Sequence, residues 1–150
     1  MTKIKHPTDR SLLFIEDEIL GKNQIDTLKN LNFSETGTRR LCFHSSNESP
    51  LHVMAVQALE NFEYTRHAHV NSDELIVVVQ GKLRVRVWST GEDSEPQIHF
   101  LGNDLETCDC AAICIPMNTL HDTMVVVADT VYLESKLGPF QPESTVYKAC

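Results

Sequence analysis

The stretch Tyr64–Gly81, YTRHAHVNSDELIVVVQG, places two histidines and a glutamate directly before an apolar, β-branched run. His67 and His69 are two residues apart, so an extended strand would hold both imidazoles on the same face. At metal–nitrogen distances of about 2.0–2.1 Å, two such rings can bind one ion. Glu74 follows the polar turn Val70–Asp73 and opens the next strand, which we expect to return antiparallel beside the first. Its carboxylate would then reach the same point from the neighbouring strand.

A second segment, IPMNTLH at residues 115–121, contains a turn followed by a third candidate ligand. His121 stands five residues after Pro116 and would open a strand. Asn118 lies inside the turn and is among the few non-glycine residues that tolerate left-handed backbone geometry. Gly81 ends the first apolar run at another tight turn, where a positive φ is often needed. Three histidines outside these motifs are expected to have structural or surface roles: His44, His52 and His99.

The chain from residue 51 onward consists of short runs rich in β-branched and apolar residues, separated by Asn, Asp, Ser, Gly and Pro. The runs are LHVMAVQAL (51–59), ELIVVV (74–79), LRVRVW (83–88), QIHFL (97–101), AAICIP (111–116), TMVVVA (123–128) and TVYLESK (130–136). Six or seven short strands at this spacing predict an all-β sandwich or barrel. The run at 83–88 alternates strictly, so its two faces meet different environments.

The first 40 residues follow a different pattern. Apolar residues recur at roughly helical spacing between Ile19 and Leu31, which predicts one short helix near 23–31. An extended arm or strand is expected at Leu12–Ile15. We predict that 1–40, as arm and helix, packs on a barrel formed by 41–150, within a single domain. Such a chain buries about 68–70% of its unfolded surface, so its core needs neither metal nor disulfides to fold.

Charge and composition exclude several classes of partner. The formal net charge is -8, with 13 Lys+Arg against 21 Asp+Glu and no basic block. Nucleic acids and anionic membranes are held by clustered Lys and Arg, so neither is expected as a partner. The N-terminal apolar run of Leu12–Ile15 is too short for a signal-peptide core, and no later run approaches the roughly 18 residues of a membrane span. The sequence therefore predicts a soluble, cytoplasmic protein.

Five cysteines, an odd number in a chain that can fold unaided, favour free thiols in a reducing compartment. Cys108, Cys110 and Cys114 share one parity, so a continuous strand would place them on one side. Their spacing matches no common zinc pattern, and free cysteine is often buried as a small apolar group. Packing is therefore favoured over a second metal site, although the sequence leaves their role open.

Two segments together resemble the paired motifs of the cupin superfamily: His67-x-His69-x4-Glu74-x6-Gly81 and, downstream, Pro116-x4-His121. The resemblance implies a small antiparallel jelly-roll β-barrel in which three histidines and one glutamate hold a metal. Carried over to this chain, the ligands would be His67, His69, Glu74 and His121. Without that resemblance, a His-x-His pair in a strand is more often two half-exposed polar residues than a metal site. Four positions depart from the usual motifs without touching a ligand: Asn61, Cys110, Asn118 and Val125.

A narrower similarity is to the WbuC family of cupin-fold metalloproteins. It rests on Arg39, Arg40 and His44, on the RHAH run, and on ESKLGPFQP at Glu134–Pro142. Members of that family are associated with bacterial O-antigen and other surface-polysaccharide gene clusters. The similarity implies a link to lipopolysaccharide biosynthesis and a small-molecule ligand such as a sugar or nucleotide-sugar.

Three imidazoles and one carboxylate suit a single divalent ion of Fe, Mn, Ni or Zn and leave one or two coordination positions open. We therefore expect a metal-dependent enzyme acting on a small polar substrate, as an isomerase or epimerase or as a dioxygenase-type cupin. One alternative is a saccharide-binding or sensor domain that contains the metal without turnover. Another is a metal-free, epimerase-type barrel, which the complete ligand set disfavours.

Three further residues are candidates for substrate contact. Tyr64 precedes the ligand pair and is a candidate catalytic residue for proton transfer. Arg84 and Arg86 could line the barrel mouth and bind an anionic substrate. The solvated outer face is the favoured alternative for both arginines, because the residues between and beside them supply the apolar side of the strand.

The extended arm also suggests an assembly. Jelly-roll barrels of this size leave sheet edges to cover, and an arm such as Leu12–Ile15 could pair with a second copy across a two-fold axis. A homodimer is therefore expected.

Overall fold

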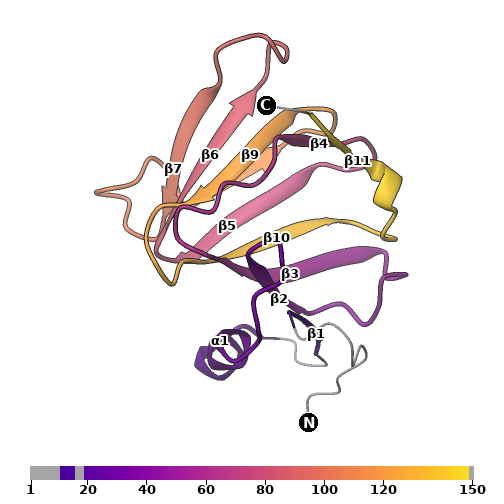
Figure 1. The fold of residues 1–150 in the computed structure, drawn as a ribbon, viewed down its shortest axis with the longest axis vertical. Coiled ribbons are helices and arrows are strands. Elements are labelled where there is room, and N and C mark those ends of the chain that lie inside the picture. The colour runs from indigo at the N-terminus through magenta and orange to yellow at the C-terminus, as the bar shows by residue number, and fades with distance from the viewer. Residues whose placement is uncertain (1–10, 16–18, 149–150) are drawn as a thin grey trace.

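The computed structural model describes residues 11–15 and 19–148, which fold into two β-sheets that face each other (Figure 1). The six-stranded sheet has the order β1 (Leu12–Phe14), β2 (Thr38–Cys42), β3 (Leu51–Ala58), β10 (Val131–Leu137), β5 (Glu74–Gln80) and β8 (Ala112–Ile115). The five-stranded sheet has the order β11 (Thr145–Tyr147), β4 (His67–His69), β9 (Leu120–Val125), β6 (Lys82–Trp88) and β7 (Gln97–Gly102). The helices are α1 (Lys22–Lys29) and a single 3₁₀ turn, η1 (Pro142–Ser144). The predicted all-β jelly roll is confirmed.

The main core lies between the two sheets. In β6, Leu83, Val85 and Val87 are buried in this core, whereas the alternate residues Arg84 and Arg86 face outward. The strict alternation of the sequence is therefore realised in the sheet, and the two arginines take the favoured outer position. Core residues of the six-stranded sheet complete the interior from the opposite side: Phe14, Cys42, Met54, Val56, Ile76 and Tyr132.

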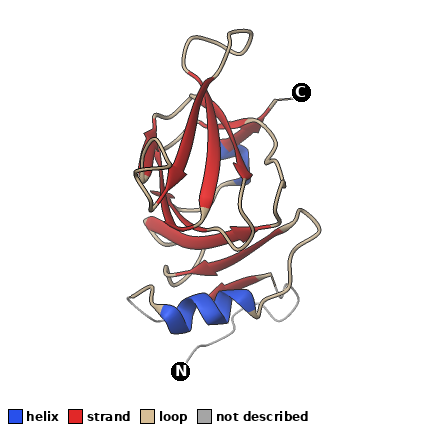
Figure 2. Cartoon of the chain, turned by 90° about the vertical axis from the view of Figure 1, so that its left-hand side faces the viewer, coloured by secondary structure: helices blue, strands red, loops and turns tan. Residues whose placement is uncertain are grey.

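The helix α1 packs on the outer side of the six-stranded sheet, against β2 and β3 (Figure 2). Leu28 of the helix is fully buried, in a second apolar cluster that includes Leu41 of β2 and Ala55 of β3. The helix spans Lys22–Lys29, two residues short of the predicted end, because Asn30 forms its C-cap. The helix thus packs on the sheet, because an amphipathic helix requires a partner for its apolar side.

The predicted arm forms β1, which pairs in parallel with β2 of its own chain. Two strands were not predicted, β2 and β11, and the predicted limit between residues 40 and 41 falls inside β2. Two arginines interrupt the apolar pattern of β2, which hides its alternation. The run expected at 123–128 corresponds to β9, which begins earlier, at Leu120, and ends at Val125. It ends early because the last residues of the run enter the turn around Asp129, whose φ is 62°.

The turns use the residues that the sequence indicated. Gly81 has a φ of 83°, and a Cβ there would overlap Oγ1 of Thr130. Asn118 has a φ of 63°, as predicted for its turn. Asn61 has a φ of 59°, so two of the four positions that depart from the usual motifs hold asparagines in left-handed geometry.

The described cysteines form no disulfide, in keeping with the predicted free thiols. Cys108 and Cys110 lie in the connection between β7 and β8, and Cys114 lies within β8, so no single strand aligns the three. Cys110 packs against the main core. The packing prediction is wrong for Cys114, which is exposed.

None of the helices within the described ranges combines the length and the apolar character needed to cross a membrane.

Candidate metal centre

The four candidate ligands come from both sheets and meet inside the barrel. His67 of β4 stands directly opposite His121 of β9, so both imidazoles project from the same face of the five-stranded sheet. His69 lies two residues along β4 on that face. The expectation that Glu74 lies on a strand beside β4 is wrong: β5 belongs to the six-stranded sheet, between β10 and β8. Its carboxylate meets the histidines across the barrel interior.

The geometry brings these side chains to one point. One donor atom from each of the four residues lies within 4.8 Å of all the others, and all four residues are buried. Oε2 of Glu74 lies 2.9 Å from Nε2 of His121, and Oε1 lies 3.2 Å from Nε2 of His69. The four residues therefore form a group that can hold a metal ion.

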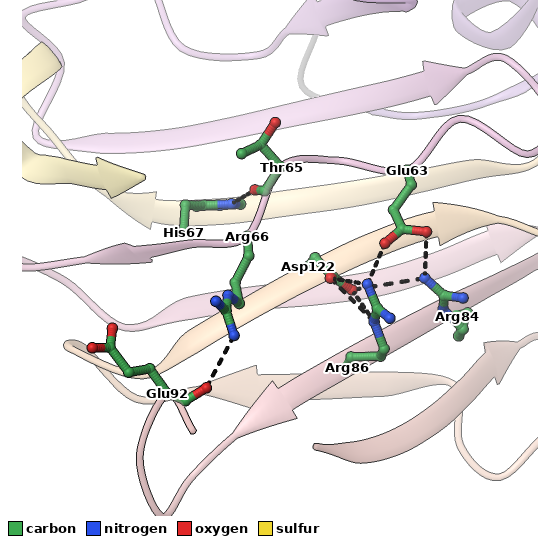
Figure 3. Close-up of polar contacts among 8 residues, drawn as sticks. All are labelled: Glu63, Thr65, Arg66, His67, Arg84, Arg86, Glu92 and Asp122. Atoms are coloured by element: carbon green, nitrogen blue, oxygen red, sulfur yellow. Dashed lines mark hydrogen bonds and ion pairs between the residues drawn. The ribbon is translucent and has the colours of Figure 1, made fainter. Parts of the chain in front are cut away.

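Partners on the far side of each ring orient the imidazoles. Nδ1 of His67 donates to the carbonyl oxygen of Thr65 at 2.8 Å (Figure 3). Nδ1 of His121 donates in the same way to the carbonyl of Thr119 at 2.9 Å. A carbonyl oxygen only accepts, so these contacts fix the proton on Nδ1 and leave Nε2 for the shared centre. Nδ1 of His69 lies 3.2 Å from Oγ1 of Thr145 on β11, which the sequence did not predict.

Burial and Glu74 set the protonation of the group. Burial, aided by the neighbouring His121, lowers the pKa of His67 to about 4, so this ring is neutral at pH 7. Burial alone would lower the pKa of His121, but the hydrogen bond and negative charge of Glu74, together with the hydrogen bond to the Thr119 carbonyl, outweigh burial and raise that pKa. Burial would raise the pKa of Glu74, yet the hydrogen bond from His121 and the close contact with His69 lower it. The glutamate is therefore ionised.

The donor set fits a divalent ion. Nε2 of His69 is buried, points at the group and makes no hydrogen bond of good geometry, so its lone pair is available. Three imidazole nitrogens and one carboxylate oxygen suit Fe, Mn, Ni or Zn. A bound ion would also replace the proton that His121 shares with Glu74, because ligands bind metals in their deprotonated form.

These residues line one part of a cavity of about 330 Å³. Tyr64, the candidate catalytic residue, also lines this cavity, with its ring centre 5.9 Å from that of His67. Nη2 of Arg40 donates a hydrogen bond to the Tyr64 hydroxyl. Burial raises the pKa of Tyr64, so its hydroxyl keeps its proton at neutral pH. The structure thus places Tyr64 in the lining of the cavity that contains the four candidate ligands.

Arg84 and Arg86 do not line the cavity. Nε of Arg86 donates to Oδ1 of Asp122 at 2.9 Å, and Nη2 of Arg84 lies 3.2 Å from Oε2 of Glu63 (Figure 3). Both guanidinium groups are therefore engaged with carboxylates on the outer face. The two arginines therefore lie on the outer face, which the sequence favoured, and not at the barrel mouth, where they were candidates for binding substrate.

Sequence reasoning missed several polar residues of the cavity: Arg40, His44, His52, Glu134 and Lys136. A signal was present in TVYLESK, where Glu134 and Lys136 alternate with outward residues. Lys136 stands opposite Glu74 in the sheet register, so both side chains lie on the inner face. That register could not be known before β10 was placed beside β5, which is far away in the sequence.

No protein-family model matches the sequence, and no curated protein matches it. Several solved structures are similar. KdgF from Halomonas sp. has a TM-score of 0.54 and 20% identity, over 75% of this chain and 89% of that chain. Oxalate decarboxylase from Bacillus subtilis has a TM-score of 0.58 and 18% identity, over 77% of this chain and 29% of that chain. These neighbours are cupin-fold proteins. The chain has the cupin fold.

A third cupin neighbour is CapF, a capsular polysaccharide assembling protein from Staphylococcus aureus. It has a TM-score of 0.57 and 17% identity, over 79% of this chain and 34% of that chain. The chain therefore spans about a third of the length of CapF or of oxalate decarboxylase. At these identities the likeness establishes the fold, and function has to be argued from the site.

Proposed function

We propose that this cupin is a metalloprotein and an enzyme that acts on a small polar substrate, with His67, His69, Glu74 and His121 holding one divalent ion. The observation that carries the proposal is the buried group of four donor atoms within 4.8 Å of one another. Such an ion supplies Lewis acidity and open coordination positions for water, dioxygen or a small molecule. The proposed reaction is an isomerisation or epimerisation, or dioxygenase-type chemistry.

Tyr64 is proposed as the proton-transfer residue. Its hydroxyl accepts a hydrogen bond from Arg40, so its own proton is free to be donated to a ligand in the cavity. The raised pKa of Tyr64 keeps that proton in place at neutral pH. Arg40 also donates from Nη1 to Oγ1 of Thr38 at 2.7 Å, and this second contact holds the guanidinium and thereby the tyrosine in position.

The proposed substrate is a sugar or nucleotide-sugar used in bacterial surface-polysaccharide metabolism. The resemblance to the WbuC family supports this choice, as does the capsular polysaccharide role named for the cupin neighbour CapF. The free thiols of the described cysteines support a cytoplasmic location. We further propose a homodimer, and gel filtration that gives a mass near that of one 16.9 kDa chain would refute it.

The test of the proposed function is metal content followed by turnover. The purified protein should contain about one divalent ion per chain, and His69→Ala should lose it without a lower melting temperature of the metal-free form. His99→Ala, which removes a histidine outside the cavity lining, should retain the ion. Purification without metal under gentle conditions would overturn the proposal.

Turnover separates an enzyme from the alternative, a non-catalytic saccharide-binding or sensor domain. Sugars and nucleotide-sugars should be screened with the metal-loaded protein, with product detection and oxygen consumption measured in parallel. Tyr64→Phe, which removes only the hydroxyl, should lower kcat while the metal is retained. Saccharide binding without any turnover would favour the binding domain.

A further inference from the structure

The six-stranded sheet contributes a second set of charged residues to the cavity, apart from the candidate ligand Glu74. Lys136 and Glu134 lie on β10, and Arg40 lies on β2. None of the three belongs to the group of candidate ligands. Two cations beside one carboxylate give this part of the cavity a charge balance opposite to that of the chain, whose net charge is -8.

Lys136 points into the cavity because of its register. It stands directly opposite His52 on β3 and Glu74 on β5. Opposite residues in an antiparallel pair project from the same face, with Cβ atoms about 4.5–5.5 Å apart. Both neighbours line the cavity, so the ammonium is directed to its interior. Among the described residues, however, no hydrogen bond or ion pair engages Nζ of Lys136. The two oxygens of Glu74 are directed at His69 and His121 instead.

Arg40 supplies the second positive charge. Its guanidinium hydrogen bonds go to the hydroxyls of Thr38 and Tyr64, which are neutral partners. The guanidinium has five N–H donors, so contacts remain for a ligand. Burial alone would lower the pKa of Arg40, but the hydrogen bond to Tyr64 and the negative field of Glu134 raise it, so the charge persists in the cavity.

Glu134 is a carboxylate of the same lining that interacts with both cations. Its field interacts with both Arg40 and Lys136, and burial raises the pKa of its own carboxyl group. Counted with Glu74, the two acids and two cations of the lining cancel. The divalent ion of the proposed function would then leave the cavity positive. A positive cavity with low-dielectric walls attracts anions and binds them more strongly than an exposed site does.

We propose that the cavity selects a small molecule with an anionic group, a carboxylate or a phosphate, and that Lys136 binds this group with Arg40 as the second cation. The proposal rests on the proposed function, because the bound ion supplies part of the positive charge. The volume of about 330 Å³ lies near the lower end of the roughly 300–1,000 Å³ typical of ligand pockets, so the ligand is small. Phe140 and Tyr147, both half-exposed, line the same cavity and offer apolar contact to the uncharged part.

The test compares glucose, glucuronate and glucose 6-phosphate, which share one ring and differ in charge. Calorimetric titration of the metal-loaded protein at constant ionic strength should show at least one anion binding about tenfold or more tightly than glucose. The tighter of the two anions identifies the group that the site prefers. Equal affinity for all three, or no binding of any, overturns the proposal.

Lys136→Met keeps the aliphatic stem and removes the charge, so the preference for the anion should fall to about threefold or less. Lys136→Arg should restore most of it. Lys82→Met is the matched control, because Nζ of Lys82 contacts the carbonyl of Thr107 outside the cavity lining. An unchanged preference in Lys136→Met with the ion bound overturns the anion site alone. A wild-type protein without any bound ion overturns the proposed function, and a preference that persists in that protein supports the anion site by itself.

Discussion

His121 and Asp122 are consecutive residues of β9 that face opposite sides of the five-stranded sheet and belong to two different charged clusters. His121 points inward, with Nε2 at 2.9 Å from Glu74 across the barrel. Asp122 points outward and accepts hydrogen bonds from Arg86 of the neighbouring strand (Figure 3). Both residues are almost fully buried, at 1% and 2% exposure. Burial therefore does not distinguish these two residues.

Charge balance and direction do distinguish them. The outer cluster pairs two guanidinium groups with two carboxylates, those of Glu63 and Asp122, so its charges are matched within the chain. The inner group has one carboxylate among three imidazoles, whose donor atoms converge on one point. A matched cluster stabilises the sheet that carries it. A convergent group of buried lone pairs is costly unless a cation joins it, so it is the one arranged for a ligand.

The largest expected effect is on the inner side. His121→Ala removes one of the four proposed ligands and should weaken metal binding by at least about 100-fold, since even partners outside the ligand shell cost about 10–100-fold. Metal affinity is measured by competition with a chelator of known affinity. Asp122→Asn, one residue away on the outer face, serves as the control and should bind the metal as the wild type does. Equal losses in both variants would show that the two faces are not independent.

The second effect is on the outer side and concerns stability. Asp122→Ala leaves Arg86 without its buried partner and should lower the free energy of unfolding by about 2 kcal/mol. Removing one member of a fully buried pair costs about 3–5 kcal/mol, and the loss is smaller here because the Arg86 side chain is 26% exposed. Urea denaturation of the metal-free protein measures it. Metal content should be unchanged. A variant with the wild-type free energy of unfolding that purifies without metal would show that Asp122 acts on the inner group and not on the stability of the outer cluster.

The sequence predicts the parts of these clusters whose residues are close together along the chain better than the parts brought together from distant strands. The ligand pair on β4 follows from spacing alone, because residues two apart on a strand share a face. His121 follows from the turn that contains Asn118, whose positive φ was predicted and is found. The cupin resemblance then supplies the set of four, and the structure brings them within reach of one another.

Long-range strand order is the part that the sequence did not reveal. Glu74 was expected beside β4, whereas β5 crosses to the other sheet and pairs with β10, about sixty residues later in the chain. Alternation indicates which residues share a face but not which strand lies next to which. The charged lining of the cavity arises from that order: Lys136 meets Glu74 only through the pairing of β10 with β5. The outer cluster is likewise a product of the pairing of β6 with β9.

The third effect is the pH dependence of metal binding by the inner group. Glu74 raises the pKa of His121 above the ordinary histidine pKa of about 6.5. As the pH falls, this ring in the metal-free protein therefore takes up its proton earlier than an ordinary histidine does. Metal must displace that proton. Apparent affinity should therefore be constant well above the raised pKa and fall by about tenfold for each pH unit below it.

Metal titrations between about pH 6 and pH 8.5, in buffers of different ionisation enthalpy, would measure both the affinity and the proton released. His67 should contribute neither to the pH dependence of the affinity nor to the protons released in this range, because its pKa of about 4 leaves it neutral. An affinity that does not change between pH 8 and pH 6 would contradict the assigned role of the His121 and Glu74 pair. The outer cluster offers the comparison, since Asp122→Asn should leave the pH profile in place.

The smallest expected effect tests whether position within the outer cluster matters. Glu63 contacts Arg84 and Arg86, as Asp122 does, but its side chain is 43% exposed against 2% for Asp122. Water screens an exposed carboxylate and solvates the guanidinium groups when it is removed, so such pairs contribute about 0–1 kcal/mol. Glu63→Ala should therefore change the free energy of unfolding by less than about 1 kcal/mol, less than half the effect of Asp122→Ala in the same urea titrations. A loss as large as that of Asp122→Ala would mean that the cluster acts as one cooperative unit, in which the number of charges matters more than their burial.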